Sequence, residues 1–258
     1  MAGKKYKNYV FDLYGTLVDI HTDENSDQVW EKLALFYGYY GALYAPQELH
    51  TLYLELIEKK ENIQKSELEA EPRYAHEAFP EIKIEKIFQE LFMRKGVEAD
   101  IELSIHAGQF FRALSTEYIR LYNGVPQMLQ AIHKMGNKIY LLSNAQRIFT
   151  AYEMNFLNIS QYFDAILISS EYGTKKPDIR FFNILLEEYQ LKPDDCIMIG
   201  NDAKCDIAGA KSAGMDTYYI HSNISPDCEG KPDATYCQME MDIEKVCRTL
   251  EIVQTGLK

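Results

Sequence analysis

The sequence predicts an α/β protein, with a Rossmann-like core built on a parallel sheet and an inserted all-helical cap domain. In the second half of the chain, short apolar runs alternate with helical segments. Such alternation is typical of a parallel sheet with helices on both faces. After the first apolar run, at residues 9–11, the alternation is interrupted by helical periodicity over residues 26–120.

The first apolar run reads as a buried strand that stops at a glycine turn, because Asp12 and Gly15 follow it directly. In the next segment, apolar residues recur at three- and four-residue spacings, which indicates a bundle of about four helices. Pro46 and Pro80 suit helix starts or turns between these helices. An all-helical insertion after a strand-end carboxylate is typical of a cap over an active site. We therefore assign residues 1–20 and 120–258 to the core domain and residues 21–119 to the cap domain.

The rest of the core is predicted as an ordered series of helices and strands. Helices are expected at residues 126–135, 147–156, 177–189, 206–213 and 243–252, and strands at residues 138–142, 165–168, 196–199, 217–220 and 234–237.

The bulk composition restricts the partners of the chain. It has 258 residues and a formal net charge of −12. Because an acidic protein repels phosphate backbones and anionic lipid, neither nucleic acid nor a membrane is an expected partner. A small anionic substrate would need a local source of positive potential, from lysine, a metal ion or helix N-termini.

The cysteines and the N-terminus favour a cytoplasmic protein. The five cysteines are odd in number, lie in the last quarter of the chain and show no CxxC spacing, so reduced thiols are expected. No signal peptide is visible, and no stretch approaches the roughly 20 apolar residues that span a bilayer.

Polar side chains follow four of the predicted core strands. Ligands bind outside the carboxyl ends of the strands in open parallel sheets, so these side chains are expected to meet at one edge. Each of these side chains, taken alone, is explained equally well as a turn carboxylate or a helix cap. Because all four groups occur in this order and each follows a predicted strand, together they indicate an active site. They are Asp12 and Thr16, then Ser143 and Asn144, then Lys176, then Asn201, Asp202 and Asp206.

With these residues in place, the chain resembles the haloacid dehalogenase-like (HAD) hydrolase superfamily, in the subgroup with a helical cap between the first and second motifs. The four motifs lie at residues 11–17 (FDLYGTL), 141–144 (LLSN), 176–178 (KPD) and 200–210 (GNDAKCDIAGA). The resemblance covers the core, and the cap matches only in its position and helicity.

The resemblance implies a role for each motif. Asp12 would be a nucleophile that forms a covalent aspartyl intermediate. Thr16, Ser143 and the backbone amide near Asn144 would bind the oxygens of the transferring group. Lys176 would offset negative charge between nucleophile and substrate.

The resemblance also implies Mg²⁺, which takes oxygen ligands. Asp12, the Tyr14 carbonyl and the motif-four residues Asn201 and Asp202 would hold the ion, and Asp206 would complete the catalytic set. Sequence spacing leaves open which of Asn201 and Asp202 faces the metal.

Tyr14 departs from the pattern of the family's phosphatases, which carry a second aspartate at this position as general acid. A phenol with a pKa near ~10 replaces a carboxylic acid poorly. Tyrosine at this position resembles the family's 2-haloacid dehalogenases, whose halide leaves without a proton. Against that likeness, residues 17–72 contain no arginine for the halide, and Asn201-Asp202 suits a cation. His21 and Asp19 are alternative proton sources.

Three functions follow from these observations. The first is a Mg²⁺-dependent phosphatase acting on a small phosphomonoester or acyl phosphate, with the cap selecting the substrate. The second is a metal-independent 2-haloacid dehalogenase that works through an aspartyl ester. The third is a non-catalytic ligand-binding protein.

Overall fold

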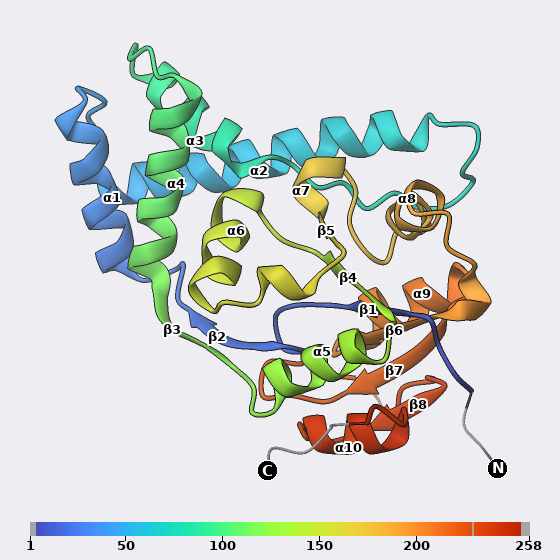
Figure 1. Cartoon of the computed structure of the whole chain (residues 1–258). Coiled ribbons are helices and arrows are strands. Elements are labelled where there is room, and N and C mark those ends of the chain that lie inside the picture. The colour runs from blue at the N-terminus through green and yellow to red at the C-terminus, as the bar shows by residue number, and fades with distance from the viewer. Residues whose placement is uncertain (1–3, 229, 254–258) are drawn as a thin grey trace.

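A parallel sheet of six strands forms the centre of the molecule, in the order β5-β4-β1-β6-β7-β8 (Figure 1). The computed structural model describes residues 4–228 and 230–253. Every neighbouring pair in this sheet is parallel, which confirms the predicted fold class. The strands are β1 (Asn8–Phe11), β4 (Lys138–Ser143), β5 (Ala165–Ile168), β6 (Cys196–Gly200), β7 (Asp216–Ile220) and β8 (Tyr236–Gln238).

The two faces of the sheet are covered by different helices, because successive side chains of a strand point to opposite faces. Tyr9 and Phe11 of β1 pack in one buried cluster with apolar residues of α5 (Val125–Lys134) and α10 (Ile243–Thr249). Val10 packs in another cluster with α8 (Ile179–Glu188) and α9 (Gly209–Ser212). The strands are therefore buried on both faces, which explains why they read as continuous apolar runs.

The helices α5 and α6 (Arg147–Phe156) agree with the prediction to within one residue, and α10 begins where predicted but ends three residues earlier. Two other helices differ more. Helix α8 begins only at Ile179, after an N-cap formed by Asp178, whose side chain accepts a hydrogen bond from the Arg180 amide. A π-helical turn, Ala203–Ala208, precedes α9 where one α-helix was expected. One short helix, α7 (Ser169–Tyr172), was not predicted.

Four helices lie between the first and second strands of the main sheet, as expected for the inserted segment. They are α1 (Asp27–Tyr39), α2 (Pro46–Glu69), α3 (Ile84–Arg94) and α4 (Ile101–Ser115). Their buried faces share an apolar cluster that contains Trp30, Tyr37, Tyr53, Phe88 and Phe111. No helix of the described ranges has the length and apolarity to cross a bilayer.

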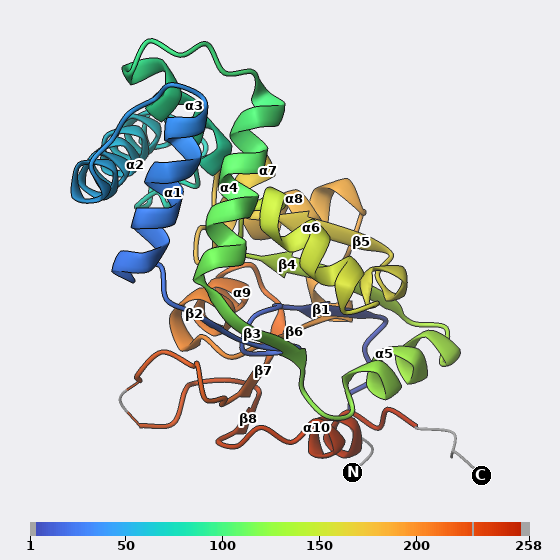
Figure 2. The same ribbon diagram turned by 90° about the vertical axis from the view of Figure 1, so that its left-hand side faces the viewer.

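A two-stranded antiparallel ribbon joins this bundle to the core (Figure 2). It consists of β2 (Val18–Thr22) and β3 (Thr116–Leu121). The prediction of helix up to residue 120 was therefore wrong at its end, since Thr116–Leu121 pairs with a strand on the far side of the insertion. The predicted domain boundaries fall inside these two strands, and the division into core and cap stays an interpretation.

A second connection, which we call the strap (residues 70–83), runs from α2 to α3 and lies against the core. Its Phe79 carbonyl accepts a hydrogen bond from the Lys175 amide at 2.9 Å, and its Glu81 amide donates one to the Gly173 carbonyl at 3.1 Å. The buried Glu81 carboxylate also accepts from Ser169 Oγ at 2.9 Å. The ribbon and the strap thus connect the helical bundle to the core at two separate places, and α4 also packs directly on α6 of the core through Ile148 and Phe149.

Candidate active site

Asp12 lies at the carboxyl end of β1. The strands that follow β1 in the chain lie on both sides of it, β4 and β5 on one side and β6, β7 and β8 on the other. Its neighbours β4 and β6 end in Ser143 and Gly200, so their following residues converge on the same edge. This is the position at which open α/β sheets bind ligands. The Asp12 side chain is close to fully buried, with the residue 8% exposed.

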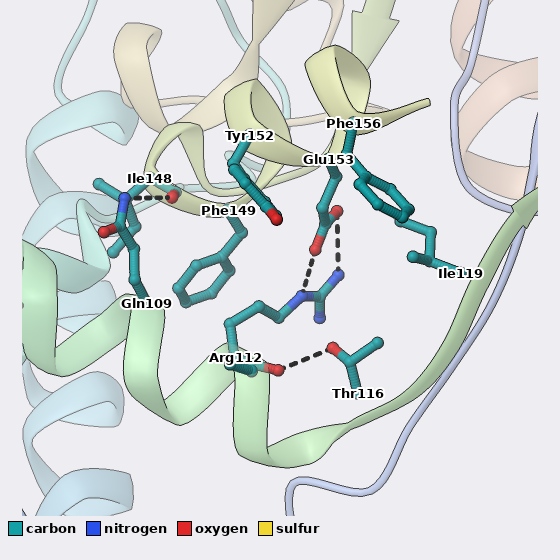
Figure 3. A pocket seen from close by; sticks show the side chains of 10 residues that line it. Gln109, Arg112, Thr116, Ile119, Ile148, Phe149, Tyr152, Glu153 and Phe156 are labelled. Atoms are coloured by element: carbon teal, nitrogen blue, oxygen red, sulfur yellow. Dashed lines mark hydrogen bonds and ion pairs between the residues drawn. The ribbon is translucent and has the colours of Figure 1, made fainter. Parts of the chain in front are cut away.

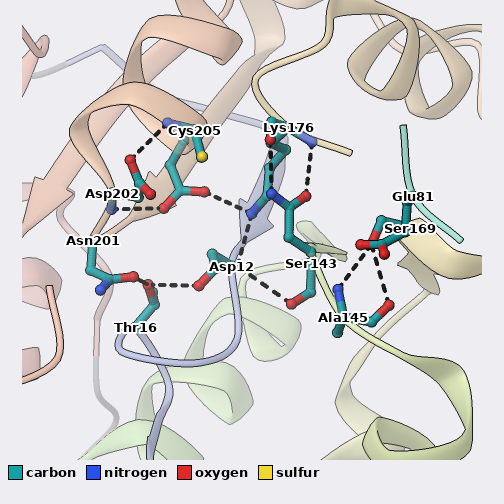
Figure 4. A network of polar contacts seen from close by, with 12 residues as sticks. Asp12, Thr16, Glu81, Ser143, Ala145, Ser169, Lys176, Asn201, Asp202 and Cys205 are labelled. Atoms are coloured by element: carbon teal, nitrogen blue, oxygen red, sulfur yellow. Dashed lines mark hydrogen bonds and ion pairs between the residues drawn. The ribbon is translucent and has the colours of Figure 1, made fainter. Parts of the chain in front are cut away.

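Lys176 bridges the two carboxylates of the site (Figure 4). Its Nζ donates to Asp12 Oδ1 at 2.8 Å and to Asp206 Oδ1 at 2.7 Å. Burial by itself lowers the pKa of Lys176, but the charges of Asp12 and Asp206 outweigh it and hold the pKa above its usual range. The lysine is therefore a fixed positive charge beside the predicted nucleophile.

Asp206 is the second partner of this lysine and is buried at the start of the segment after β6. Burial raises the pKa of Asp206 to about 7, and the positive charge of Lys176 acts in the opposite direction. Its Oδ2 accepts a hydrogen bond from the Asp202 amide at 2.9 Å. The carboxylate thus holds both Lys176 and the loop that follows β6.

Two hydroxyls lie next to the Asp12 carboxylate. Ser143 Oγ is 3.4 Å from Asp12 Oδ1, and Thr16 Oγ1 is 3.4 Å from Asp12 Oδ2. These are long contacts for hydroxyl donors, whose usual distance to an acceptor is about 2.7–2.8 Å. Neither hydroxyl is therefore held tightly by the carboxylate, and the binding of substrate oxygens by these two hydroxyls stays a prediction.

Asn144 holds the backbone of Lys176 with both ends of its side chain. Its Oδ1 accepts from the Lys176 amide and its Nδ2 donates to the Lys176 carbonyl, each at 2.8 Å. The structure therefore places this side chain on the lysine loop, whereas the predicted phosphate contact concerns the backbone amide near Asn144. Only its backbone remains available for the predicted contact.

The structure shows that the side chains of Asn201 and Asp202 face different partners, a point that the sequence spacing left open. Asn201 Oδ1 lies 3.3 Å from Thr16 Oγ1, on the side of Asp12 (Figure 4). Asp202 Oδ1 instead accepts hydrogen bonds from the amides of Lys204 and Cys205, both at 2.8 Å, and so caps the following helical turn. Asn201 therefore presents its oxygen on the side of Asp12, whereas Asp202, which also lines the cavity around Asp12, uses Oδ1 to hold the following turn.

The oxygens around Asp12 suit Mg²⁺ in kind, although they are few. The ion takes one or two carboxylates, with waters and substrate phosphates completing its shell. Asp12 Oδ2 and Asn201 Oδ1 both lie beside the Thr16 hydroxyl, at 3.4 and 3.3 Å. Within the described residues, no three His, Cys, Asp or Glu side chains are grouped to hold a metal. A Mg²⁺ site here would draw on the Asp12 carboxylate together with amide, carbonyl and substrate oxygens.

The hydroxyl of Tyr14 bonds to α6 and not to Asp12. It donates to the Glu153 carboxylate and lies 3.0 Å from Thr150 Oγ1. Burial, followed by the negative charge of Glu153, raises the pKa of the Tyr14 phenol above its usual value. A phenol that is held protonated and already donates its proton is unsuited to act as general acid for a leaving group at Asp12.

Glu153 also lines a cavity next to Tyr14 that is larger than the cavity around Asp12 (Figure 3). That cavity, of about 460 Å³, lies between α4 and α6 and has mainly apolar walls, including Ile148 and Phe149. Its main charged feature is the ion pair of Arg112 Nε with Glu153 Oε1, at 2.7 Å. Since Asp12 is not among its lining residues, the cavity is separate from the candidate site.

The cavity that contains Asp12 is smaller, about 240 Å³. All of its lining residues in the described ranges lie outside α1–α4, so the bundle does not form its wall here. Ile224 and Pro226, from the segment after β7, line it together with Cys205. Sequence reasoning missed this segment, because neither residue carries a chemical signal.

The two proton sources considered from sequence lie on β2, away from this cavity. Asp19 is paired with Arg120 Nη2 at 2.8 Å and accepts from Asn223 at 2.9 Å. Burial acts to raise the pKa of Asp19, but these hydrogen bonds outweigh it and lower the pKa. His21 stacks on Tyr118 and faces Glu117. Neither side chain lines the cavity around Asp12.

Replacing Tyr14 with phenylalanine is expected to change kcat by less than about threefold and to leave its pH profile unchanged, because the phenol does not reach the reacting centre. The free energy of unfolding should fall by roughly 1–3 kcal/mol, since Glu153 loses a buried donor. Steady-state kinetics across pH 5–9 and thermal unfolding test both points. A loss of the acid or basic limb of the profile would instead assign the phenol a role in proton transfer.

Comparison with known proteins gives one family. A family model described as haloacid dehalogenase-like hydrolase matches residues 6–214. A phosphoglycolate phosphatase of Vibrio vulnificus is 29% identical over 127 residues, 48% of this chain and 55% of the relative. A glyceraldehyde 3-phosphate phosphatase of Methanopyrus kandleri is 26% identical over 155 residues, 60% of this chain and 66% of the relative. The alignments thus span between about half and two thirds of these relatives.

Solved structures share the fold over nearly the whole chain. A 2-haloacid dehalogenase of Pseudomonas syringae superposes with a TM-score of 0.61 and 18% identity, covering 95% of this chain and 98% of that one. A HAD phosphatase of Thermococcus onnurineus gives a TM-score of 0.53 and 16% identity, covering 96% of this chain and all of that one. At such identities the likeness concerns the fold alone.

Proposed function

Because the chain belongs to the haloacid dehalogenase-like hydrolase family, we propose that it is a Mg²⁺-dependent phosphatase acting on small, anionic phosphate esters or acyl phosphates. One observation carries the proposal: a buried carboxylate, Asp12, faces a fixed lysine at 2.8 Å with a hydroxyl beside each of its oxygens. The phosphatase relatives support the choice of phosphate over halide.

In the proposed reaction, the Asp12 carboxylate attacks phosphorus, and the bond from phosphorus to the leaving oxygen breaks. Lys176 lies between Asp12 and Asp206, so it offsets negative charge where the phosphoryl group arrives. The hydroxyls of Thr16 and Ser143 turn from the carboxylate to the phosphoryl oxygens. Water then cleaves the aspartyl phosphate, which releases inorganic phosphate and restores Asp12.

Asp12 and Asn201, with the Tyr14 carbonyl, would hold Mg²⁺ in this scheme. When bound, the ion would neutralise charge on the phosphate and reduce its repulsion from Asp12. Asp202 would keep the π-helical turn in place as a cap, and Asp206 would position Lys176.

The leaving group determines which phosphate substrates can react without a general acid. The Tyr14 hydroxyl is bound to Glu153, and neither Asp19 nor His21 lines the cavity, so none of the three can protonate a leaving oxygen there. We therefore propose that good leaving groups are preferred, as in acyl or aryl phosphates. The small cavity favours a compact leaving group.

Phosphate release from an acyl phosphate, an aryl phosphate and an alkyl phosphate, each with Mg²⁺ and with chelator, tests the proposal. We expect turnover that depends on Mg²⁺ and falls in the order given, because the alkoxide leaves least readily. Turnover that is unchanged by chelator would remove the metal from the scheme, and equal rates for the three substrates would imply an unrecognised general acid.

The second candidate is hydrolysis of a carbon–halogen bond, because a departing halide needs no proton and none of Tyr14, Asp19 and His21 is placed to supply one. The absence of an arginine from residues 17–72 opposes it. Chloride release from 2-chloropropionate in the presence of chelator, with no phosphate release from any of the three phosphates, would favour this candidate.

A further inference from the structure

We propose that Ser225 is a positioning residue that holds the Asn201 amide with its oxygen toward Asp12 and thereby makes asparagine a usable Mg²⁺ ligand. The inference rests on the proposed function and concerns a residue beyond the family match, which ends at residue 214. It explains how an amide can stand where the sequence pattern leads one to expect a carboxylate.

The two ends of an asparagine amide are chemically different. The Oδ1 atom has lone pairs and can bind a cation, whereas the Nδ2 group is a donor and would repel one. An aspartate at this position would present an oxygen in either orientation. An asparagine therefore needs a neighbour that fixes its orientation, and a second residue becomes part of the cation site.

Ser225 meets this need on the far side of the Asn201 side chain. Asn201 Nδ2 donates to Ser225 Oγ at 3.2 Å. The opposite end, Oδ1, lies 3.3 Å from Thr16 Oγ1. In Figure 4 the nitrogen of Asn201 points away from Asp12, and the oxygen faces it.

The turn around Ser225 leaves its hydroxyl as an acceptor for Asn201. The Ser222 amide donates to Ser225 Oγ at 2.9 Å, and Ser222 Oγ lies at 3.2 Å. A hydroxyl has one hydrogen and two lone pairs. With the hydrogen directed to Ser222 Oγ, one lone pair receives the Ser222 amide and the other receives Asn201 Nδ2. This arrangement uses both lone pairs of the hydroxyl, and Tyr219 is a further neighbour with which its hydrogen can bond.

Packing restricts the amide as well. Gly15 has a φ of +82°, and a Cβ atom there would lie 2.3 Å from Asn201 Nδ2, so the amide rests directly on the glycine backbone. Asn201 is 5% exposed and Ser222 is also 5% exposed. The amide is thus confined between the turn that follows Asp12 and the turn that follows β7.

A double-mutant cycle with a metal-binding readout tests the proposal. Mg²⁺ dissociation constants are measured by calorimetry without substrate for the parent, Ser225→Ala, Ser225→Thr, Asn201→Asp and the Asn201→Asp/Ser225→Ala double variant. Thermal unfolding without Mg²⁺ shows whether each variant is folded.

We expect Ser225→Ala to weaken Mg²⁺ binding by about tenfold or more, the usual effect of losing a residue that orients a ligand. Ser225→Thr, which keeps the hydroxyl, should stay near the parent. In the Asn201→Asp background, Ser225→Ala should change the constant by less than roughly threefold, because a carboxylate has oxygen at both ends.

Equal effects of Ser225→Ala in the two backgrounds would overturn the inference, since a general disturbance of the loop does not depend on the amide. Parent-like binding by folded Ser225→Ala would also overturn it while leaving the proposed function intact. No Mg²⁺ binding by the folded parent would overturn both the metal-dependent function and this inference.

Discussion

Replacing Asp12 with asparagine is expected to lower phosphatase turnover by roughly 10⁴-fold or more, the scale seen when a covalent nucleophile is removed. The amide cannot form an aspartyl phosphate, and no other carboxylate takes its place, because Asp206 is held behind Lys176. Phosphate release from an aryl phosphate, with protein at high concentration to measure residual activity, gives the ratio directly.

The same variant should remain folded, because Lys176 keeps Asp206 as its partner. A matched control is Asp164→Asn, which changes a carboxylate at the opposite end of β4, where it binds Lys138. That control should retain turnover within a few-fold. If Asp12→Asn kept more than about one hundredth of parental turnover, the covalent mechanism would be excluded, since 10⁴-fold losses accompany removal of such groups.

Replacing Lys176 with methionine is expected to abolish turnover and to lower the free energy of unfolding at pH 8 by roughly 3–5 kcal/mol, the usual effect of breaking a buried ion pair. Methionine matches the length of lysine, so the change removes the charge more than the packing. Asp12 and Asp206 then face each other without the cation that lies between them at 2.8 and 2.7 Å. For a chain of this size, the thermal midpoint should fall by roughly 6–20 °C.

The loss of folding stability in Lys176→Met should become smaller as the pH is lowered from 8 to 5. Burial already raises the pKa of Asp206 to about 7 in the parent, and removing the lysine charge raises it further. A group whose pKa is higher in the folded than in the unfolded state stabilises the fold as it takes up its proton, so acid favours the folded variant. The double variant Lys176→Met/Asp206→Asn, with one carboxylate fewer, should recover much of the loss at pH 8. A single variant as stable as the parent at pH 8 would show that the lysine charge is not required there.

The parallel sheet could be predicted because its strands are buried on both faces and are separated by helices. This arrangement leaves continuous apolar runs such as residues 196–199, which a local reading detects. The convergence of Asp12, Ser143, Lys176 and Asn201 followed from a topological rule about strand ends. Their joint position at one edge therefore did not depend on any contact between distant residues being known.

The ribbon and the strap could not be predicted in the same way. Val18 pairs with Leu121 across the entire insertion, and nothing local marks such a partner. The side-chain roles of Asn144 and Asp202 also escaped, because a polar residue after a strand can face either the site or a backbone. Only the three-dimensional positions of the Lys176 backbone and of the Lys204 and Cys205 amides decide between these possibilities.

The two attachments of the helical bundle have a mechanical consequence. The ribbon leaves the core directly after the turn that contains Thr16, and the strap pairs with Lys175, next to Lys176. A third contact holds the bundle as well, because Ile148 and Phe149 of α6 belong to its apolar cluster and Arg112 of α4 pairs with Glu153 at 2.7 Å. Any movement of the bundle therefore has to disrupt this contact between α4 and α6. The ribbon and the strap would transmit such a movement to the chain beside Thr16 and Lys176.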